Sequence, residues 1–236
     1  MNEMPWDFWL IFVVLGVVIP WRGHVRLKRL LTLPFVDTKE KLVLYATTIC
    51  VQWILAGVVA WRSFARGLTF AGLGLGHRTT AGILLWSLVG SLFFGVFQWS
   101  NLRRVGRMTG PVADRMRSLA ERLLPRSAVE FAPYVALAIT AGVCEEFLYR
   151  GFVIGALAST GISRWTVVAI SSVLFGLAHT YQGRSGVFGT TLLGLLFGTA
   201  RLHVQSLMPA MAWHAAVDVV AGIAGPRYLL SRQDWR

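Results

Sequence analysis

Seven apolar stretches dominate the sequence, and they limit the possible folds more than any other feature. Hydrophobic residues make up 55% of the 236 residues and charged residues only 14%, which is typical of a helical membrane protein. Lipid offers no hydrogen-bond partners to open backbone groups, so every stretch that crosses a bilayer must be a helix. The sequence therefore predicts an all-α, polytopic membrane protein with about seven transmembrane helices. The expected spans are Trp6–Pro20, Lys41–Trp61, Ala81–Trp99, Phe131–Gly155, Trp165–His179, Val187–Ala200 and Leu207–Ala224.

Several of these spans are shorter than the ~20 residues of a straight crossing, which predicts tilt or local thinning of the bilayer. Tryptophans near many of the span ends are typical of the interface between lipid and water. They are Trp6, Trp21, Trp61, Trp99 and Trp165.

The basic residues predict the orientation. Most of the 23 Lys and Arg residues follow the first span, follow the third span or lie in the C-terminal tail. Because cytoplasmic loops carry the excess of basic residues, we expect the N-terminus outside and the C-terminus inside. An odd number of spans agrees with this N-out/C-in topology. Glu3 precedes the first span, Asp7 lies at its start and basic residues follow it, the reverse of a cleaved signal peptide, so we expect this span to be retained.

The net charge of +12 raises the question of a nucleic-acid partner. The basic residues are spread over short loops and are not clustered with exposed aromatics, so we expect no nucleic acid and predict contact with the anionic surface of a lipid bilayer. Arginine supplies 20 of the 23 basic residues, and with the short loops this favours a bacterial chain. We therefore expect a multi-pass protein of the inner (plasma) membrane.

The chain divides into three expected parts. Residues 1–100 hold three N-terminal transmembrane helices, residues 101–130 form an amphipathic cytoplasmic connector, and residues 131–225 form a four-helix membrane core. Apolar positions of the connector recur at three- and four-residue spacing between Val105 and Leu123, which predicts a helix lying against headgroups. A solvated loop is the alternative.

Two adjacent glutamates, Glu145 and Glu146, interrupt the fourth span. A carboxylate at membrane depth is costly unless it is paired or neutralised. Arg150 lies four residues after Glu146, on the same helix face, so we expect an ion pair. Glu145 points about 100° away and lacks such a cation. Burial therefore favours its neutral form, which suits a general base that takes up and releases a proton. The alternative is that both glutamates lie at a helix end and reach water.

Two later spans add further ionisable groups. His179 ends the fifth span, four residues after Phe175, and His214 and Asp218 stand four residues apart in the seventh. Pro209, five residues before His214, is a residue that can bend this helix. Each of these groups alone is typical of a structural or interfacial residue. Because every buried ionisable group adds its own desolvation cost, their number predicts one shared polar pocket inside the membrane.

The three motifs in this order resemble the signature of the CPBP family, also called the ABI or type II CAAX protease family. The resemblance covers about Phe131 to Ala224. It implies an intramembrane endopeptidase that hydrolyses a peptide bond in a membrane-anchored protein or peptide substrate, as in C-terminal processing. The motifs are Glu145-Glu146-x-x-x-Arg150, Phe175-x-x-x-His179 and His214-x-x-x-Asp218.

The resemblance also implies roles for individual residues. Glu145 would activate a water molecule, and His179 would help to hold or deprotonate it. Glu146 and Arg150 would form an orienting ion pair. His214 would donate a hydrogen bond to the developing oxyanion.

Asp218 departs from the asparagine of the eukaryotic prenyl protease, although aspartate is familiar among bacterial relatives. An ionised aspartate repels an oxyanion, so Asp218 would be protonated, orient His214 or bind a metal. Zinc is the alternative to metal-free chemistry, with Glu145, His179, His214 and Asp218 as ligands. The chain lacks His-Glu-x-x-His, and the resemblance favours glutamate-activated water, so we expect no cofactor.

Two other functions fit parts of the pattern. A catalytically inactive membrane binding or immunity-type protein of the same fold would keep the pocket without turnover. An ion-coupled transporter would use buried carboxylates and histidines as a relay. The sequence shows no inverted repeat to support a transporter.

Overall fold

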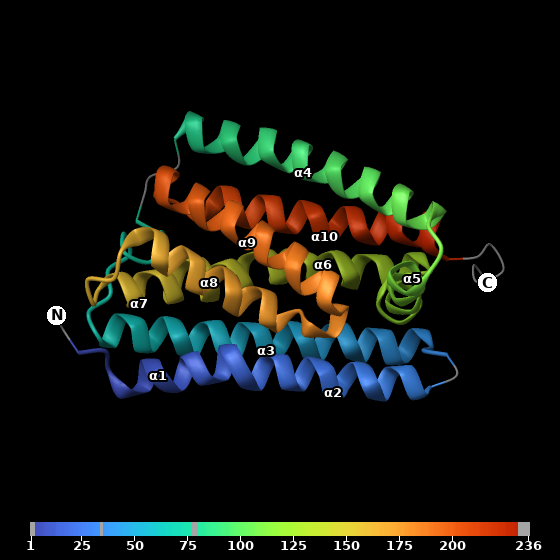
Figure 1. Ribbon diagram of the computed structural model, residues 1–236, viewed down its shortest axis with the longest axis horizontal. Coiled ribbons are helices and arrows are strands. Elements are labelled where there is room, and N and C mark those ends of the chain that lie inside the picture. Colours follow the sequence, from blue (N-terminus) through green and yellow to red (C-terminus); the bar gives the residue numbers. More distant parts are fainter. Residues whose placement is uncertain (1–2, 34, 77–79, 231–236) are drawn as a thin grey trace.

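The computed structural model describes residues 3–33, 35–76 and 80–230, and every regular element in these ranges is helical. The helices run side by side along the long axis of the molecule, and α1 begins at the end opposite to the one where α10 finishes (Figure 1). Most of these elements are α-helices, but η1 and η2 are π-helical and η3 is a 3-10 turn. The elements are α1 (Trp6–Val13), η1 (Val14–Val18), α2 (Ile19–Thr32), α3 (Thr38–Ala65), α4 (Ala81–Arg107), α5 (Pro111–Leu123), α6 (Ala128–Glu146), η2 (Phe147–Val153), α7 (Ile154–Ala158), α8 (Arg164–Ala178), η3 (Thr180–Gln182), α9 (Arg184–Val204) and α10 (Met208–Leu229).

Six helices within the described residues are long and apolar enough to cross a membrane, in agreement with the predicted all-α membrane class. Each of the seven expected spans corresponds to an apolar helix. The fifth of these, α8, has only 15 residues and is not among the six long helices. The six long helices run from Trp6–Thr32, Thr38–Ala65, Ala81–Arg107, Ala128–Ala158, Arg184–Val204 and Met208–Leu229. The observed helices extend beyond the expected spans at most of their ends. As a result, α8 is the helix among the described residues that is too short for a straight crossing, and a thinned bilayer is implied only there.

The ends of a helix depend on capping residues more than on hydropathy, which explains why the helices extend beyond the apolar stretches. Asp37 and Glu40 form a reciprocal capping box at the start of α3. A serine or threonine side chain accepts a backbone hydrogen bond at the start of α4, α6 and α8. At α3, α6 and α8 these polar residues start the helix one to three residues before the apolar stretch begins, whereas α4 begins at Ala81 as expected.

The first helix does not end at Pro20, where we had expected it to end. Proline lacks an N–H and removes one hydrogen bond from the helix ladder. The preceding residues Val14–Val18 adopt a π-helical conformation, and α2 continues to Thr32. The local widening of the helix accommodates the proline without breaking it.

The packing order places α10 at the centre of the bundle. Helix α10 lies between α4 and α6, α3 packs against α6, and α8 pairs with α9 (Figure 1). A side chain at Gly142 of α6 would place its Cβ 2.8 Å from the carbonyl oxygen of Met211 and 2.9 Å from the backbone nitrogen of Ala215. Glycine therefore permits a close crossing of α6 and α10, the two helices that carry most of the predicted site.

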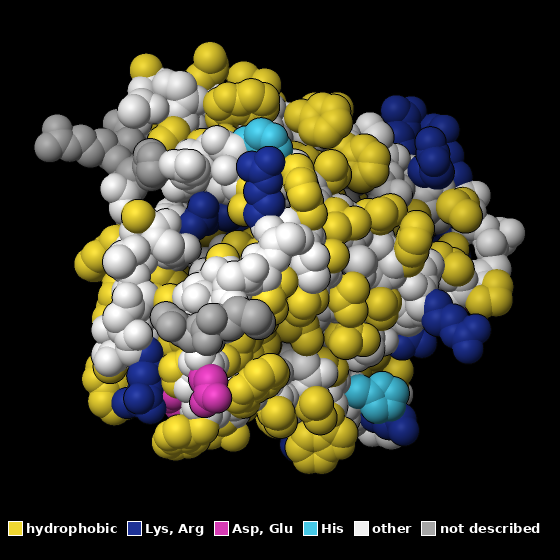
Figure 2. Space-filling model, turned by 60° about the vertical axis from the view of Figure 1, so that its left-hand side comes forward, with side chains coloured by type: hydrophobic (Ala, Val, Ile, Leu, Met, Phe, Trp, Pro, Cys, Tyr) yellow, Lys and Arg dark blue, Asp and Glu magenta, His cyan; other side chains and the backbone are white. Residues whose placement is uncertain are grey.

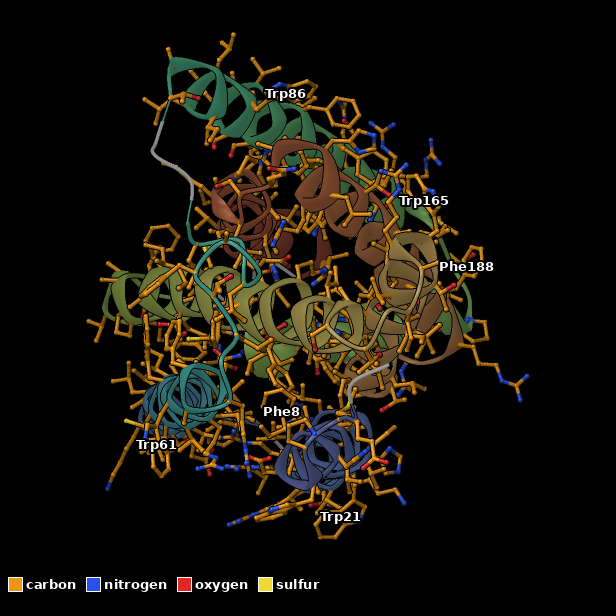
Figure 3. The ribbon with its side chains drawn as sticks, turned by 90° about the vertical axis from the view of Figure 1, so that its left-hand side faces the viewer. Phe8, Trp21, Trp61, Trp86, Trp165 and Phe188 are labelled. Atoms are coloured by element: carbon orange, nitrogen blue, oxygen red, sulfur yellow. The ribbon has the colours of Figure 1, made fainter. Side chains whose placement is uncertain are left out.

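Large apolar side chains face outward as well as inward. Seen along the helices, Trp21, Trp61 and Trp86 lie on the outside, whereas Phe8 points into the interior (Figure 3). Trp61 is 65% exposed and Phe8 is 2% exposed. Hydrophobic side chains cover much of the face shown in Figure 2. Apolar surface of this extent requires a lipid environment. Trp21 belongs to the interior of the first long helix rather than to its end.

The predicted connector, residues 101–130, contains the end of α4, all of α5 and the start of α6. Its expected helix is interrupted before Pro111, because Gly110 has a φ of 102° and Pro111 occupies the first turn of α5. Helix α5 is seen nearly end-on at one end of the bundle (Figure 1). The cytoplasmic location of α5 and the N-out/C-in topology stay predictions, and the tail after residue 230 lies outside the described residues.

Candidate active site

The six residues singled out in the sequence converge on one site between α6, α8 and α10. Glu145 and Glu146 end α6, and Arg150 lies in η2. His179 follows the last residue of α8, and His214 and Asp218 lie within α10. The contacts below connect these groups to one another.

Glu146 forms the buried centre of the site. Its Oε1 accepts a hydrogen bond from Nη1 of Arg150 at 2.9 Å and another from Nδ1 of His214 at 2.8 Å. The side chains of Glu146 and Arg150 are both 0% exposed. A buried charge pair needs good geometry and further hydrogen bonds to offset desolvation. The pair with Arg150 was expected from the spacing, whereas the bond to His214 was not.

Aromatic rings hold the other side of Arg150. Its Cζ lies 4.0 Å from the ring centroid of Phe175 and 5.8 Å from that of Phe197. Such a placement adds cation–π attraction to the ion pair. Phe175 also contacts the rings of His179 and His214, with centroid distances of 4.6 Å and 5.7 Å. Phe175 therefore packs against three polar members of the site at once.

Glu145 has different surroundings from its neighbour. Its Oε1 accepts a hydrogen bond from Nε2 of Gln52 at 2.7 Å, and its Oε2 lies 4.0 Å from Nε2 of His179. Its side chain is 20% exposed. No cation donates a hydrogen bond to this carboxylate within the described part of the chain.

Gln52 is the site residue that the sequence reasoning missed. It lies in the middle of α3, in a part of the chain without a recognisable motif. The available signal was a carboxamide inside an apolar span, which needs a hydrogen-bond partner at membrane depth.

The position of His179 fixes the proton on its ring. Its Nδ1 lies 2.8 Å from the carbonyl oxygen of Phe175, one turn earlier. A carbonyl only accepts, so Nδ1 carries a hydrogen. In the neutral ring, Nε2 then has a free lone pair, and this is the nitrogen nearest to Glu145.

Asp218 stands next to the other nitrogen of His214. Its Oδ2 lies 3.6 Å from Nε2 of His214, which is too long for a hydrogen bond. The Asp218 side chain is 35% exposed. Pro209 occupies the first turn of α10, so it starts this helix and does not bend it near His214.

The zinc alternative requires donor atoms that converge on one point. Among residues 3–33, 35–76 and 80–230, no three His, Cys, Asp or Glu side chains are grouped so that they could hold a metal ion. The donor set Glu145, His179, His214 and Asp218 therefore does not fit a zinc ion in this arrangement.

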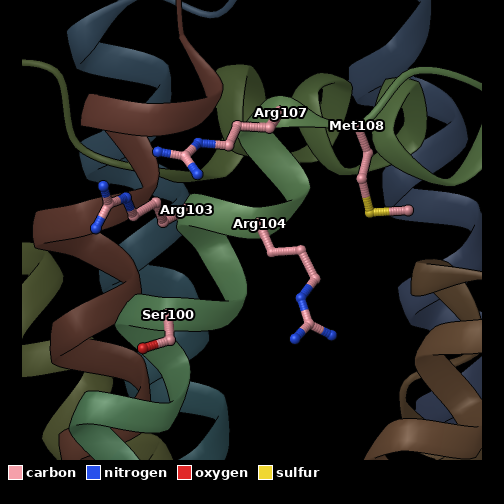
Figure 4. A pocket seen from close by; sticks show the side chains of 5 residues that line it. All are labelled: Ser100, Arg103, Arg104, Arg107 and Met108. Atoms are coloured by element: carbon pink, nitrogen blue, oxygen red, sulfur yellow. The ribbon is translucent and has the colours of Figure 1, made fainter.

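A cavity of about 490 Å³ lies apart from this site, at the end of α4. It is lined by Ser100, Arg103, Arg104, Arg107 and Met108. The guanidinium group of Arg104 points away from those of Arg103 and Arg107 (Figure 4). Groups that do not converge make a poor binding site, so we place the functional site at the glutamates.

Comparison with known proteins agrees with the resemblance seen in the sequence. Residues 127–220 match the family described as type II CAAX prenyl endopeptidase Rce1-like. Neither the curated proteins nor the solved structures gave a match. The matched segment contains every site residue named above except Gln52. The segment that carries the two glutamates, both histidines and Asp218 is therefore similar to the Rce1-like type II CAAX prenyl endopeptidases.

Proposed function

We propose that this protein is an intramembrane endopeptidase in which Glu145 activates a water molecule to cut a membrane-anchored protein substrate. One observation carries the proposal. Oε2 of Glu145 faces the unprotonated nitrogen of His179 at 4.0 Å, whereas Glu146 is held through its Oε1 by Arg150 and His214. The Glu145 side chain is 20% exposed and that of Glu146 is 0% exposed, so of the two adjacent carboxylates only Glu145 is accessible to water and substrate.

A separation of 4.0 Å suits two groups that share one water molecule better than two groups that bond directly. Nε2 of His179 would accept one hydrogen bond from the water, and Glu145 would accept the other. This arrangement aligns a lone pair of the water oxygen for attack.

The reaction proceeds in two steps. Glu145 takes a proton from the water while the water oxygen bonds to the carbonyl carbon of the substrate. The tetrahedral intermediate carries its negative charge on the former carbonyl oxygen. Glu145 then gives the proton to the leaving nitrogen as the C–N bond breaks, which regenerates the carboxylate.

His214 is the proposed donor to the oxyanion. Its Nδ1 donates to Glu146, so a second donation from Nε2 requires the imidazolium form. Asp218 lies on the Nε2 side, where it would steady the charged ring between two carboxylates. We propose this positioning role for Asp218 rather than direct contact with the oxyanion.

We derive no step through zinc, because the donor side chains of the described residues are not grouped to hold a metal ion. Glu145 lies near the middle of the continuous helix Ala128–Ala158, which favours a substrate whose anchor is already in the bilayer. We propose a bacterial inner-membrane protease that processes the C-terminal or membrane-proximal part of its substrate. A prenylated CAAX substrate is less favoured in a bacterial cell.

The test compares protein termini in membrane fractions from cells with the native chain and cells with Glu145→Gln at matched abundance. Mass spectrometry should detect termini that vanish in the variant, and these would name both the substrate and the cut site. An unchanged set of termini, with both proteins folded, would reject proteolysis. It would favour the catalytically inactive binding or immunity-type protein instead.

A further inference from the structure

We infer that Gln52, on α3, positions the general base by fixing the orientation of the Glu145 carboxylate. The inference rests on the proposed function. It assigns a role in the chemistry to α3, which lies outside the segment that matches the family.

The hydrogen bond settles the orientation of both side chains. A carboxylate only accepts, so the partner atom of Gln52 must be its NH₂ group and not its carbonyl oxygen. This donation engages Oε1 of Glu145 at 2.7 Å. The remaining oxygen, Oε2, is the one directed at His179. Without Gln52, the carboxylate could rotate about its terminal bond, and neither oxygen would be held toward His179.

Gln52 is poorly explained as a stabilising residue. Its own carbonyl oxygen is buried and has no hydrogen-bond partner among the described residues. Leaving a buried acceptor unsatisfied is unfavourable, and an apolar side chain of similar shape would avoid this cost. A glutamine at this position is therefore better explained by its bond to Glu145 than by a contribution to folding.

The contacts between α3 and α6 next to Gln52 hold its backbone in place. Helix α3 packs along α6, and the next residue, Trp53, donates a hydrogen bond from Nε1 to Oγ1 of Thr140 at 3.2 Å. The Trp53–Thr140 bond joins the same two helices one turn before Glu145 and does not touch the site. It therefore provides a matched control for any effect of altered α3–α6 packing.

The experiment uses the full chain in detergent and a peptide that spans the cut site found by terminus mapping. Gln52→Met should lower kcat by ~10- to 100-fold and change KM by less than about twofold, because misplacement of a catalytic group affects the chemical step. Trp53→Phe should leave both constants within about twofold of the native values. Gln52→Met added to Glu145→Gln should cause no further loss, because the base that Gln52 positions is already absent.

The outcomes separate this inference from the proposed function. If the native chain cuts and Glu145→Gln does not, but Gln52→Met keeps the native kcat, the positioning role is wrong and the protease remains. Equal losses in Gln52→Met and Trp53→Phe would also overturn it, because they would assign the effect to packing. If native and Glu145→Gln chains yield the same termini, the proposed function and this inference fail together.

Discussion

Nδ1 of His214 donates a hydrogen bond to Oε1 of Glu146, and this 2.8 Å contact ties the centre of α10 to the end of α6. The same carboxylate oxygen binds Arg150. Glu146 is therefore the junction that holds the site together, while Glu145 beside it keeps one oxygen free. This division between a structural and a chemical carboxylate leads to opposite expectations for the two glutamates.

Glu145→Gln should abolish catalysis and leave the fold intact. The loss in kcat should be on the order of 10²- to 10⁴-fold, the usual contribution of a general base. The side chain is partly exposed, and an amide keeps its size, so the midpoint of thermal unfolding should change little. Peptide cleavage and thermal unfolding in detergent check both parts. A variant that retains native turnover would exclude Glu145 as the base.

Glu146→Gln should destabilise the protein strongly. It leaves the buried Arg150 without its counter-charge, and breaking such a pair typically lowers the free energy of unfolding by about 3–5 kcal/mol. Denaturant unfolding of the purified chain measures the free energy of unfolding. Glu145→Gln is the control, because it makes the same substitution at the neighbouring residue. Similar stability of the two variants would contradict the assignment of Glu146 as the junction.

Gly142→Ala should separate α6 from α10. The added Cβ meets backbone atoms of Met211 and Ala215, which cannot move like a flexible side chain. Overpacking of this kind costs about 1–3 kcal/mol in unfolding free energy and should also lower activity. Gly57→Ala on α3 is the control, because a Cβ there meets nothing within 4 Å. That substitution should be neutral or stabilising.

Strong chelators should leave peptide cleavage unchanged, because the described donor atoms are not arranged to hold a metal ion. The measurement is the cleavage rate of the purified chain before and after treatment with EDTA or 1,10-phenanthroline. Activity that disappears on chelation and returns with added zinc would reject the glutamic mechanism.

Reporter fusions should place the C-terminus in the cytoplasm. A C-terminal green fluorescent protein should fluoresce, and a C-terminal alkaline phosphatase should stay inactive, because the basic loops are expected to stay on the cytoplasmic side. The reverse pattern would invert the predicted topology and the side from which substrates approach.

The sequence was sufficient for the membrane class, and it singled out Glu145, His179 and His214, because desolvation leaves few reasons to keep such groups in apolar helices. It also predicted the bond between Glu146 and Arg150, since their spacing lies within one helix. The sequence did not predict the contacts between helices. The bond from His214 to Glu146 depends on how closely α6 and α10 cross, which Gly142 permits only in the context of its neighbours.

Gln52 and Pro20 illustrate two further limits. The role of Gln52 depends on which helix lies beside α6, and hydropathy carries no information about neighbours. Pro20 suggested a helix end, but the π-helical residues before it absorb the missing hydrogen bond. Local rules therefore located the apolar segments better than they located the ends of the helices.

The shortness of α8 has a consequence for the bilayer. Its 15 residues rise only about 22 Å, less than the roughly 30 Å of a hydrocarbon core. The chain leaves the helix at His179 and turns through Thr180–Gln182, and backbone of this kind at membrane depth needs protein or water around it. We therefore expect the bilayer to be locally thinner beside α8.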